Sequence, residues 1–96
     1  MNDKVQLKHP QGKKPISMSK EKYTLLKPAV LKYLRTKGDA TFSEISSAIQ
    51  KDFKAKGQAF EGSLLWHLEW VKLDLEARKV IRRVPKTSPQ AYVIVR

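Results

Sequence analysis

Apolar residues recur every three or four positions along the first half of the chain, the spacing that places them on one face of a helix. The first such run begins near Lys20 and ends at Gly38. Pro28 lies inside it and lacks a backbone N–H, so we expect either a kink there or a separate first turn. The apolar face of this predicted helix consists of Leu26, Val30, Tyr33 and Leu34.

A second helix is predicted to begin at Thr41, because Thr41 and Glu44 have the spacing of a capping box. In that motif the two side chains satisfy each other's free backbone N–H groups. The buried stripe of the helix should consist of Phe42, Ile45, Ile49 and Phe53. Gly57 and Gly62 bracket a loop, so we expect the helix to end before it.

A third helix is predicted from about Ser63 to Arg78, and it is apolar on two sides. At about 100° per residue, its two stripes point in nearly opposite directions. One stripe consists of Trp66, Trp70, Leu73 and Ala77, and the other of Leu64, Leu68, Val71 and Leu75. We interpret this as a central helix packed between the other helices and the C-terminal strands, in preference to a helix with an exposed interface stripe.

The end of the chain predicts a two-stranded hairpin. Val80 and Ile81 open an extended segment, residues 85–90 have turn chemistry, and residues 91–95 are rich in β-branched and aromatic side chains. The expected fold class is therefore α+β, with three helices followed by a C-terminal two-stranded β-hairpin.

The segment before the first helix is predicted to be a basic N-terminal arm over residues 1–19, followed by one domain over residues 20–96. Proline and glycine interrupt any periodicity in the arm. Val5, Leu7 and Ile16 offer apolar anchors, so we expect partial docking of the arm onto the domain.

The net charge says more about the partner of this protein than the rest of its composition does. The 96 residues suffice for one domain, and they carry a formal net charge of +11. Such a balance makes an anionic polymer the default partner. The absence of cysteine rules out disulfides, and we expect a cytoplasmic protein. The lysine-bearing first twenty residues contain no apolar run for a signal peptide or membrane span.

The order of three helices and a hairpin resembles the winged-helix domain, a helix-turn-helix variant, over residues 20–95. Lys79 stands where such domains usually have a glycine before the wing. The chain also resembles a family of small bacterial winged-helix proteins of unknown function. That similarity rests on Val5-x-Leu7-x-His9-Pro10-x-Gly12-Lys13, on Lys22-Tyr23 and on the run from Trp70 to Ala77. It implies that the arm belongs to the domain.

The first functional hypothesis is a DNA-binding regulatory or accessory protein that contacts the phosphates of duplex DNA through the wing and the arm. The proposed phosphate contacts are Lys13, Lys14, Lys79, Arg82, Arg83 and Lys86, and the proposed base contacts are Ser63 and His67. Charges at the wing could equally protect a strand edge from pairing. The region of the third helix contains one lysine and four acidic residues, Glu61, Glu69, Asp74 and Glu76. This negative charge argues against base reading by that helix.

The alternative hypothesis is a protein-interaction or homodimer domain that uses the third helix. Trp66 lies toward the projecting end of that helix, so we expect its ring to be partly exposed as an anchor for a partner. Trp70, one turn further on, should belong to the core.

The sequence predicts no enzyme, metal site, cofactor or small-molecule substrate. His9 and His67 are the only histidines and have no cysteine or helical histidine partner. Ser63 and His67 lack a strained nucleophile turn. Asp74 and Glu76 diverge by about 200° on a helix and cannot share a metal.

Overall fold

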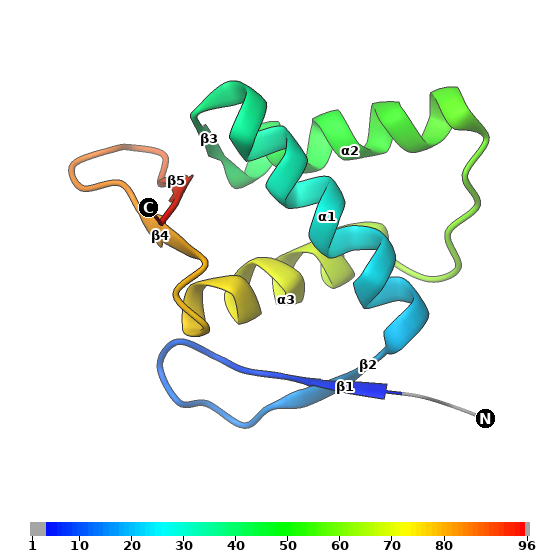
Figure 1. Ribbon diagram of the computed structural model, residues 1–96, viewed down its shortest axis with the longest axis horizontal. Helices are drawn as coiled ribbons and strands as arrows, with labels where there is room; N and C mark the ends of the chain where they lie inside the picture. The colour runs from blue at the N-terminus through cyan, green and yellow to red at the C-terminus, as the bar shows by residue number, and fades with distance from the viewer. Residues whose placement is uncertain (1–3, 96) are drawn as a thin grey trace.

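A computed structural model describes residues 4–95, which form an α+β structure of three helices and two small antiparallel sheets (Figure 1). In chain order the elements are β1 (Lys4–Leu7), β2 (Ile16–Ser19), α1 (Lys20–Lys37), β3 (Asp39–Thr41), α2 (Phe42–Lys56), α3 (Leu64–Ala77), β4 (Ile81–Arg83) and β5 (Ala91–Ile94). The strands are thus interspersed among the helices, and the expectation of strands only at the C-terminal end was wrong.

Helix α1 runs unbroken from Ser19, whose hydroxyl caps its first turn, to Gly38. Pro28 lies inside this single helix, so the alternative of a separate first turn was wrong, whereas the kink stays a prediction. Pro28 and Thr24 are both exposed. Pro28 has no N–H to donate to the Thr24 carbonyl, but water can solvate this carbonyl instead. The helix can therefore continue through Pro28.

Helix α2 begins at the predicted capping box. Thr41 Oγ1 accepts a hydrogen bond from the backbone N–H of Glu44, and the Glu44 carboxylate accepts one from the N–H of Thr41. Gly57 ends the helix in the left-handed region, at a φ of 66°. The sequence prediction of this element is confirmed at both ends.

Helix α3 lies at the centre of the molecule, below α1 and between the two sheets in Figure 1. Leu68, Val71 and Leu75 are completely buried, as predicted for one of its two stripes. The other stripe is not sandwiched: Trp66 is 47% exposed, and Trp70 is only partly buried rather than a core residue. The preferred interpretation, a helix covered on both sides, was therefore wrong.

The C-terminal hairpin is part of a three-stranded sheet in the order β3–β5–β4. Arg82 pairs with Val93 and Arg83 with Tyr92, so the two arginines point to opposite faces, as the alternation of a strand requires. Strand β3, which was not predicted, has three residues between Gly38 and the capping box, too few for an alternating pattern to show.

The N-terminal arm, over its described residues, is a β-hairpin. Strand β1 pairs with β2 in antiparallel register, and the hairpin packs against α1 and α3. Leu7 and Met18 are 0% and 3% exposed, so each strand contributes one side chain to the main core.

Candidate nucleic-acid interface

The exposed cations proposed as phosphate contacts lie on the two hairpins and on the turn after α3. Lys13 and Lys14 are in the β1–β2 loop, Lys86 is in the β4–β5 loop, Arg82 is on β4, and Lys79 is in the turn. In Figure 1 both hairpin loops lie at the left, on either side of the C-terminal end of α3. Two cationic segments that lie more than sixty positions apart in the sequence are thus on the same side of the molecule in this view.

The β1–β2 loop and the C-terminal end of α3 enclose a hollow of about 330 Å³. Lys8, His9 and Lys13 line it together with Ala77, the last residue of α3. Lys79 follows Ala77 by two positions, in the turn after α3. We call the cations of this region, Lys8, Lys13, Lys14 and Lys79, the basic end. Lys8 was not among the predicted contacts.

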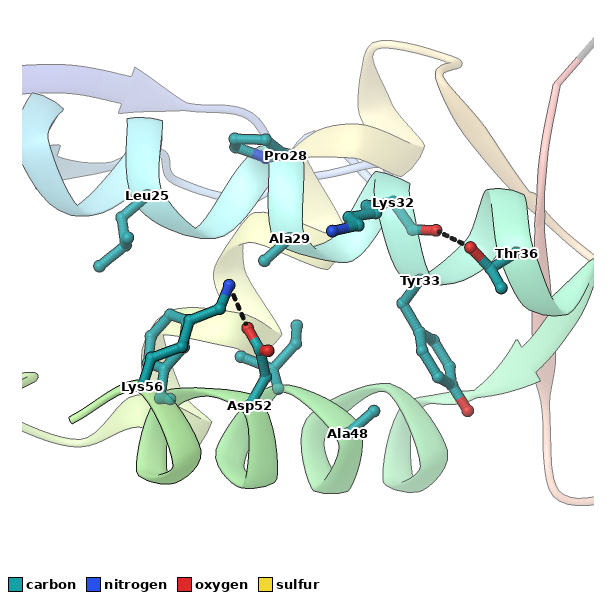
Figure 2. Close-up of a pocket in the computed structure, with 11 residues that line it drawn as sticks. Leu25, Pro28, Ala29, Lys32, Tyr33, Thr36, Ala48, Asp52 and Lys56 are labelled. Carbon is teal, nitrogen blue, oxygen red and sulfur yellow. Dashed lines mark hydrogen bonds and ion pairs between the residues drawn. The ribbon is translucent and has the colours of Figure 1, made fainter. Parts of the chain in front are cut away.

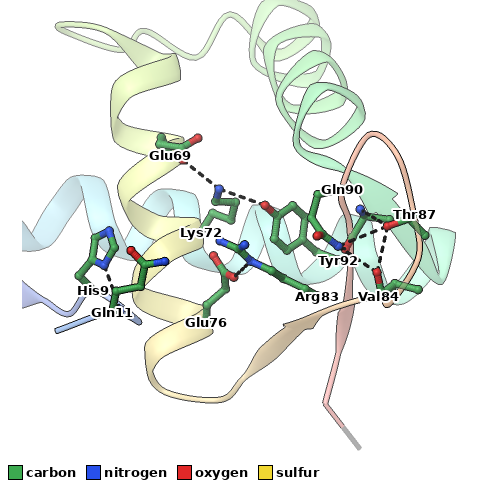
Figure 3. Close-up of polar contacts among 11 residues, drawn as sticks. His9, Gln11, Glu69, Lys72, Glu76, Arg83, Val84, Thr87, Gln90 and Tyr92 are labelled. Atoms are coloured by element: carbon green, nitrogen blue, oxygen red, sulfur yellow. Dashed lines mark hydrogen bonds and ion pairs between the residues drawn. The ribbon is translucent and has the colours of Figure 1, made fainter. Parts of the chain in front are cut away.

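The β4–β5 loop is held by side-chain hydrogen bonds (Figure 3). The Gln90 amide donates to the Val84 carbonyl at 2.9 Å, and Thr87 Oγ1 accepts from the Ala91 N–H at 2.9 Å. Lys86, between these anchors, has a φ of 62°. The loop thus presents Lys86 from a fixed backbone, which lowers the entropy lost when a phosphate binds.

Arg83 differs from the other predicted phosphate contacts because Glu76 already holds it. Arg83 Nε donates to Glu76 Oε1 at 2.8 Å (Figure 3), and this hydrogen bond raises the pKa of the guanidinium. The side chain is 52% exposed, but its charge is largely balanced. Arg83 is therefore less available for a phosphate contact than the other predicted residues.

The carboxylates of α3 are paired, so the helix is not the negative surface expected from its sequence. Lys72 Nζ donates to Glu69 at 2.9 Å and to the Tyr92 hydroxyl at 3.2 Å (Figure 3). Burial lowers the pKa of Lys72, but these two hydrogen bonds outweigh it and raise the pKa above its usual value. Asp74 and Glu76 are paired with arginines.

Asp74 joins three parts of the fold and is completely buried. Its carboxylate accepts hydrogen bonds from the Tyr23 hydroxyl of α1 at 2.6 Å, from the Lys8 N–H of the arm at 2.9 Å and from Arg78 Nε at 2.9 Å. This junction fixes the β1–β2 hairpin, and hence the basic end, on the helices. The spacing of four between Asp74 and Arg78 was the available signal for it.

The junction predicts a loss of stability at high pH. Burial and the hydrogen bond to Asp74 raise the pKa of Tyr23 to about 12. Between pH 10 and 12 the unfolded chain loses this proton while the folded protein keeps it, so stability falls as pH rises. Urea denaturation at pH 9 and 11 should show a larger loss for the wild type than for Tyr23→Phe. Equal losses would contradict the assignment.

Ser63 and His67, proposed for base reading, both make hydrogen bonds at the start of α3. Ser63 Oγ accepts from the Trp66 N–H at 3.1 Å. His67 Nδ1 lies 2.6 Å from the Ser63 carbonyl, so Nδ1 carries the proton and donates. Ser63 is thus the N-cap of α3, and base contact by either side chain stays a prediction.

Five aromatic rings, three on α3 and two on neighbouring loops, form a series that we call the aromatic strip. In spatial order they are Phe60, His67, Trp66, Trp70 and His9. Neighbouring ring centroids lie between 4.9 Å and 6.3 Å apart. The strip therefore runs from the loop before α3 to the hollow at the basic end, where His9 stands.

A groove of about 470 Å³ separates α1 from α2 (Figure 2). Ala29 and Ala48 face each other across it, and these small side chains leave the space. An ion pair between Asp52 and Lys56, 2.9 Å long, lies at its edge. None of the sequence-predicted site residues lines this groove.

Within residues 4–95, no helix is both long and apolar enough to cross a membrane. The same residues bring together no group of three histidine or carboxylate side chains suited to hold a metal ion.

Comparison with known families assigns the chain to one family, whose function is not known. The model of a family of unknown function, DUF6958, matches residues 4–92. The chain therefore belongs to this family, and the match includes the β1–β2 hairpin as well as the three helices. No curated protein and no solved structure matches the chain significantly.

Proposed function

We propose that the protein is a non-enzymatic winged-helix protein that binds duplex DNA through phosphate contacts from its basic end and wing. The observation that carries this proposal is the hollow in which the β1–β2 loop, with Lys8 and Lys13, meets Ala77 at the end of α3, two positions before Lys79. The order of helices followed by β4 and β5 supports the winged-helix assignment.

The pattern of paired and unpaired cations supports contacts with phosphate groups. Arg78 and Arg83 are held by carboxylates, whereas Lys79, Arg82 and Lys86 have exposed side chains on one edge of the molecule. Phosphate contacts fix the protein on a duplex without reading its sequence. We therefore expect similar affinity for duplexes of different sequence.

The test compares two double variants that remove the same charge. Each phosphate contact contributes about 0.9 to the slope of log affinity against log salt. Arg82→Ala/Lys86→Ala should lower the slope by nearly two and weaken duplex binding roughly tenfold to a hundredfold at low salt. Lys51→Ala/Lys54→Ala, on the exposed side of α2, should change both much less. Fluorescence anisotropy across about 50 to 200 mM salt measures both quantities.

An unchanged slope in the wing variant would refute the proposal. Equal losses in the two variants would also refute it, because the binding would then follow net charge and not a defined surface. Lys13→Ala/Lys14→Ala extends the test to the β1–β2 loop, where we expect a loss similar to that of the wing variant.

A further inference from the structure

We propose that the aromatic strip binds unpaired bases of single-stranded nucleic acid. The strip ends at the hollow of the basic end and so shares Lys8 and Lys13 with the surface proposed for duplex DNA, but Trp66 belongs to the strip alone, and Arg82 and Lys86 belong to the duplex surface alone. Variants at these unshared positions therefore test the two proposals separately. Base stacking also accounts for the exposed apolar side chains of α3 in a chain with a net charge of +11.

Trp66 is the central ring of the strip and is 47% exposed. Its neighbours hold it from both sides: His67 lies 4.9 Å away at an interplanar angle of 77°, and Trp70 lies 6.3 Å away. A ring fixed by other rings loses little rotational freedom when a base stacks on it. Stacking tolerates any base, since every base has a π-face.

Cations stand at both ends of the strip. At one end Lys22 Nζ lies 5.2 Å from the centre of the Phe60 ring and donates to the Glu61 carbonyl. At the other end His9 shares its hollow with Lys8 and Lys13. A strand whose bases stack along the rings would thus meet ammonium groups near its phosphates, the combination that single-strand binding surfaces use.

The exposed apolar surface is too small for a stable protein interface. Leu65 and Trp66 are the large exposed apolar residues of α3 within the described chain. Protein interfaces bury about 800 Å² on each partner, far more than two side chains supply. A second copy of the chain would also carry a net charge of +11, which opposes self-association. Stacking needs only one accessible ring for each base.

The experiment uses the full chain and an oligothymidine of about twelve nucleotides, within the site sizes of known single-strand binders. Both tryptophans of the protein lie in the strip, so intrinsic fluorescence reports on this surface alone. We expect the oligonucleotide to quench tryptophan emission at low salt. Inorganic polyphosphate of equal charge should quench much less.

Three variants locate the contact through anisotropy of the labelled oligonucleotide. Trp66→Ala should weaken binding about 5- to 100-fold, and Trp66→Phe should restore most of the affinity. Leu65→Ala is the matched control, since Leu65 is 50% exposed but has no π-face. It should bind like the wild type. Arg82→Ala/Lys86→Ala should retain quenching even where duplex binding is lost.

Several outcomes would overturn the inference. Absence of quenching by the oligonucleotide at low salt is one, and equal quenching by polyphosphate is another. Equal losses for Leu65→Ala and Trp66→Ala would show a general apolar contact instead of stacking. Self-association that depends on both residues, without oligonucleotide binding, would identify the surface as a protein interface.

Discussion

Removal of residues 1–18 will lower the free energy of unfolding by about 3 to 6 kcal/mol, because two buried side chains are lost at about 1.5 to 3 kcal/mol each. Those side chains are Leu7 and Met18, both in the main core. Ser19 is kept, so the cap of α1 survives the truncation. At about 4 to 8 °C for each kcal/mol, the melting temperature should fall by at least about 12 °C.

Two full-length variants separate packing from chain length in this experiment. Leu7→Ala should cost about 2 to 5 kcal/mol, the usual range for a completely buried leucine. Lys13→Ala/Lys14→Ala changes exposed side chains of the same hairpin and should leave the melting temperature nearly unchanged. If the truncated protein melts at the wild-type temperature, the hairpin does not stabilise the helices.

Asp74→Ala is expected to destabilise the protein by about 3 kcal/mol, near the lower end of the cost of breaking a buried ion pair, because Asp74 is buried but Arg78 is 36% exposed. The carboxylate is 0% exposed and accepts hydrogen bonds from α1, from the arm and from Arg78. Its loss leaves the Tyr23 hydroxyl and the Lys8 N–H without a protein acceptor. Denaturation with urea measures the change.

The chain supplies a matched control for this substitution. Asp52 forms the same i, i+4 contact with Lys56, also at 2.9 Å, but its side chain is 50% exposed. Asp52→Ala should therefore cost less than about 1 kcal/mol, as surface pairs do. Similar costs at the two positions would contradict the role assigned to burial at Asp74.

The helices were predictable because their signals are local. The capping box of α2 needs only Thr41 and Glu44, and the buried stripe of α3 repeats over three turns. The strands β1, β2 and β3 were missed, since strands of three or four residues are too short to show alternation. Their pairing depends on partners far along the chain, as when Ala40 meets Tyr92.

The candidate site was predicted in its residue types more than in its arrangement. The exposure of Lys79, Arg82 and Lys86 could be predicted, because these residues lie in a cationic segment with the signals of a strand and a turn. The pairing of Arg83 with Glu76, seven residues away, could not be predicted, because it requires β4 to return alongside α3. The exposure of Trp66 was foreseen from its place near the start of α3, and the partial exposure of Trp70 was not.

The short outer strands of the three-stranded sheet have a consequence for behaviour at high concentration. Strands β3 and β4 form its two edges and have three residues each. Arg82 and Arg83 occupy β4, and Pro85, which has no N–H to donate, follows two residues after it. Such an edge gives an incoming strand few backbone groups to pair with and repels a second copy of itself. The sheet is therefore protected against growth into fibrils.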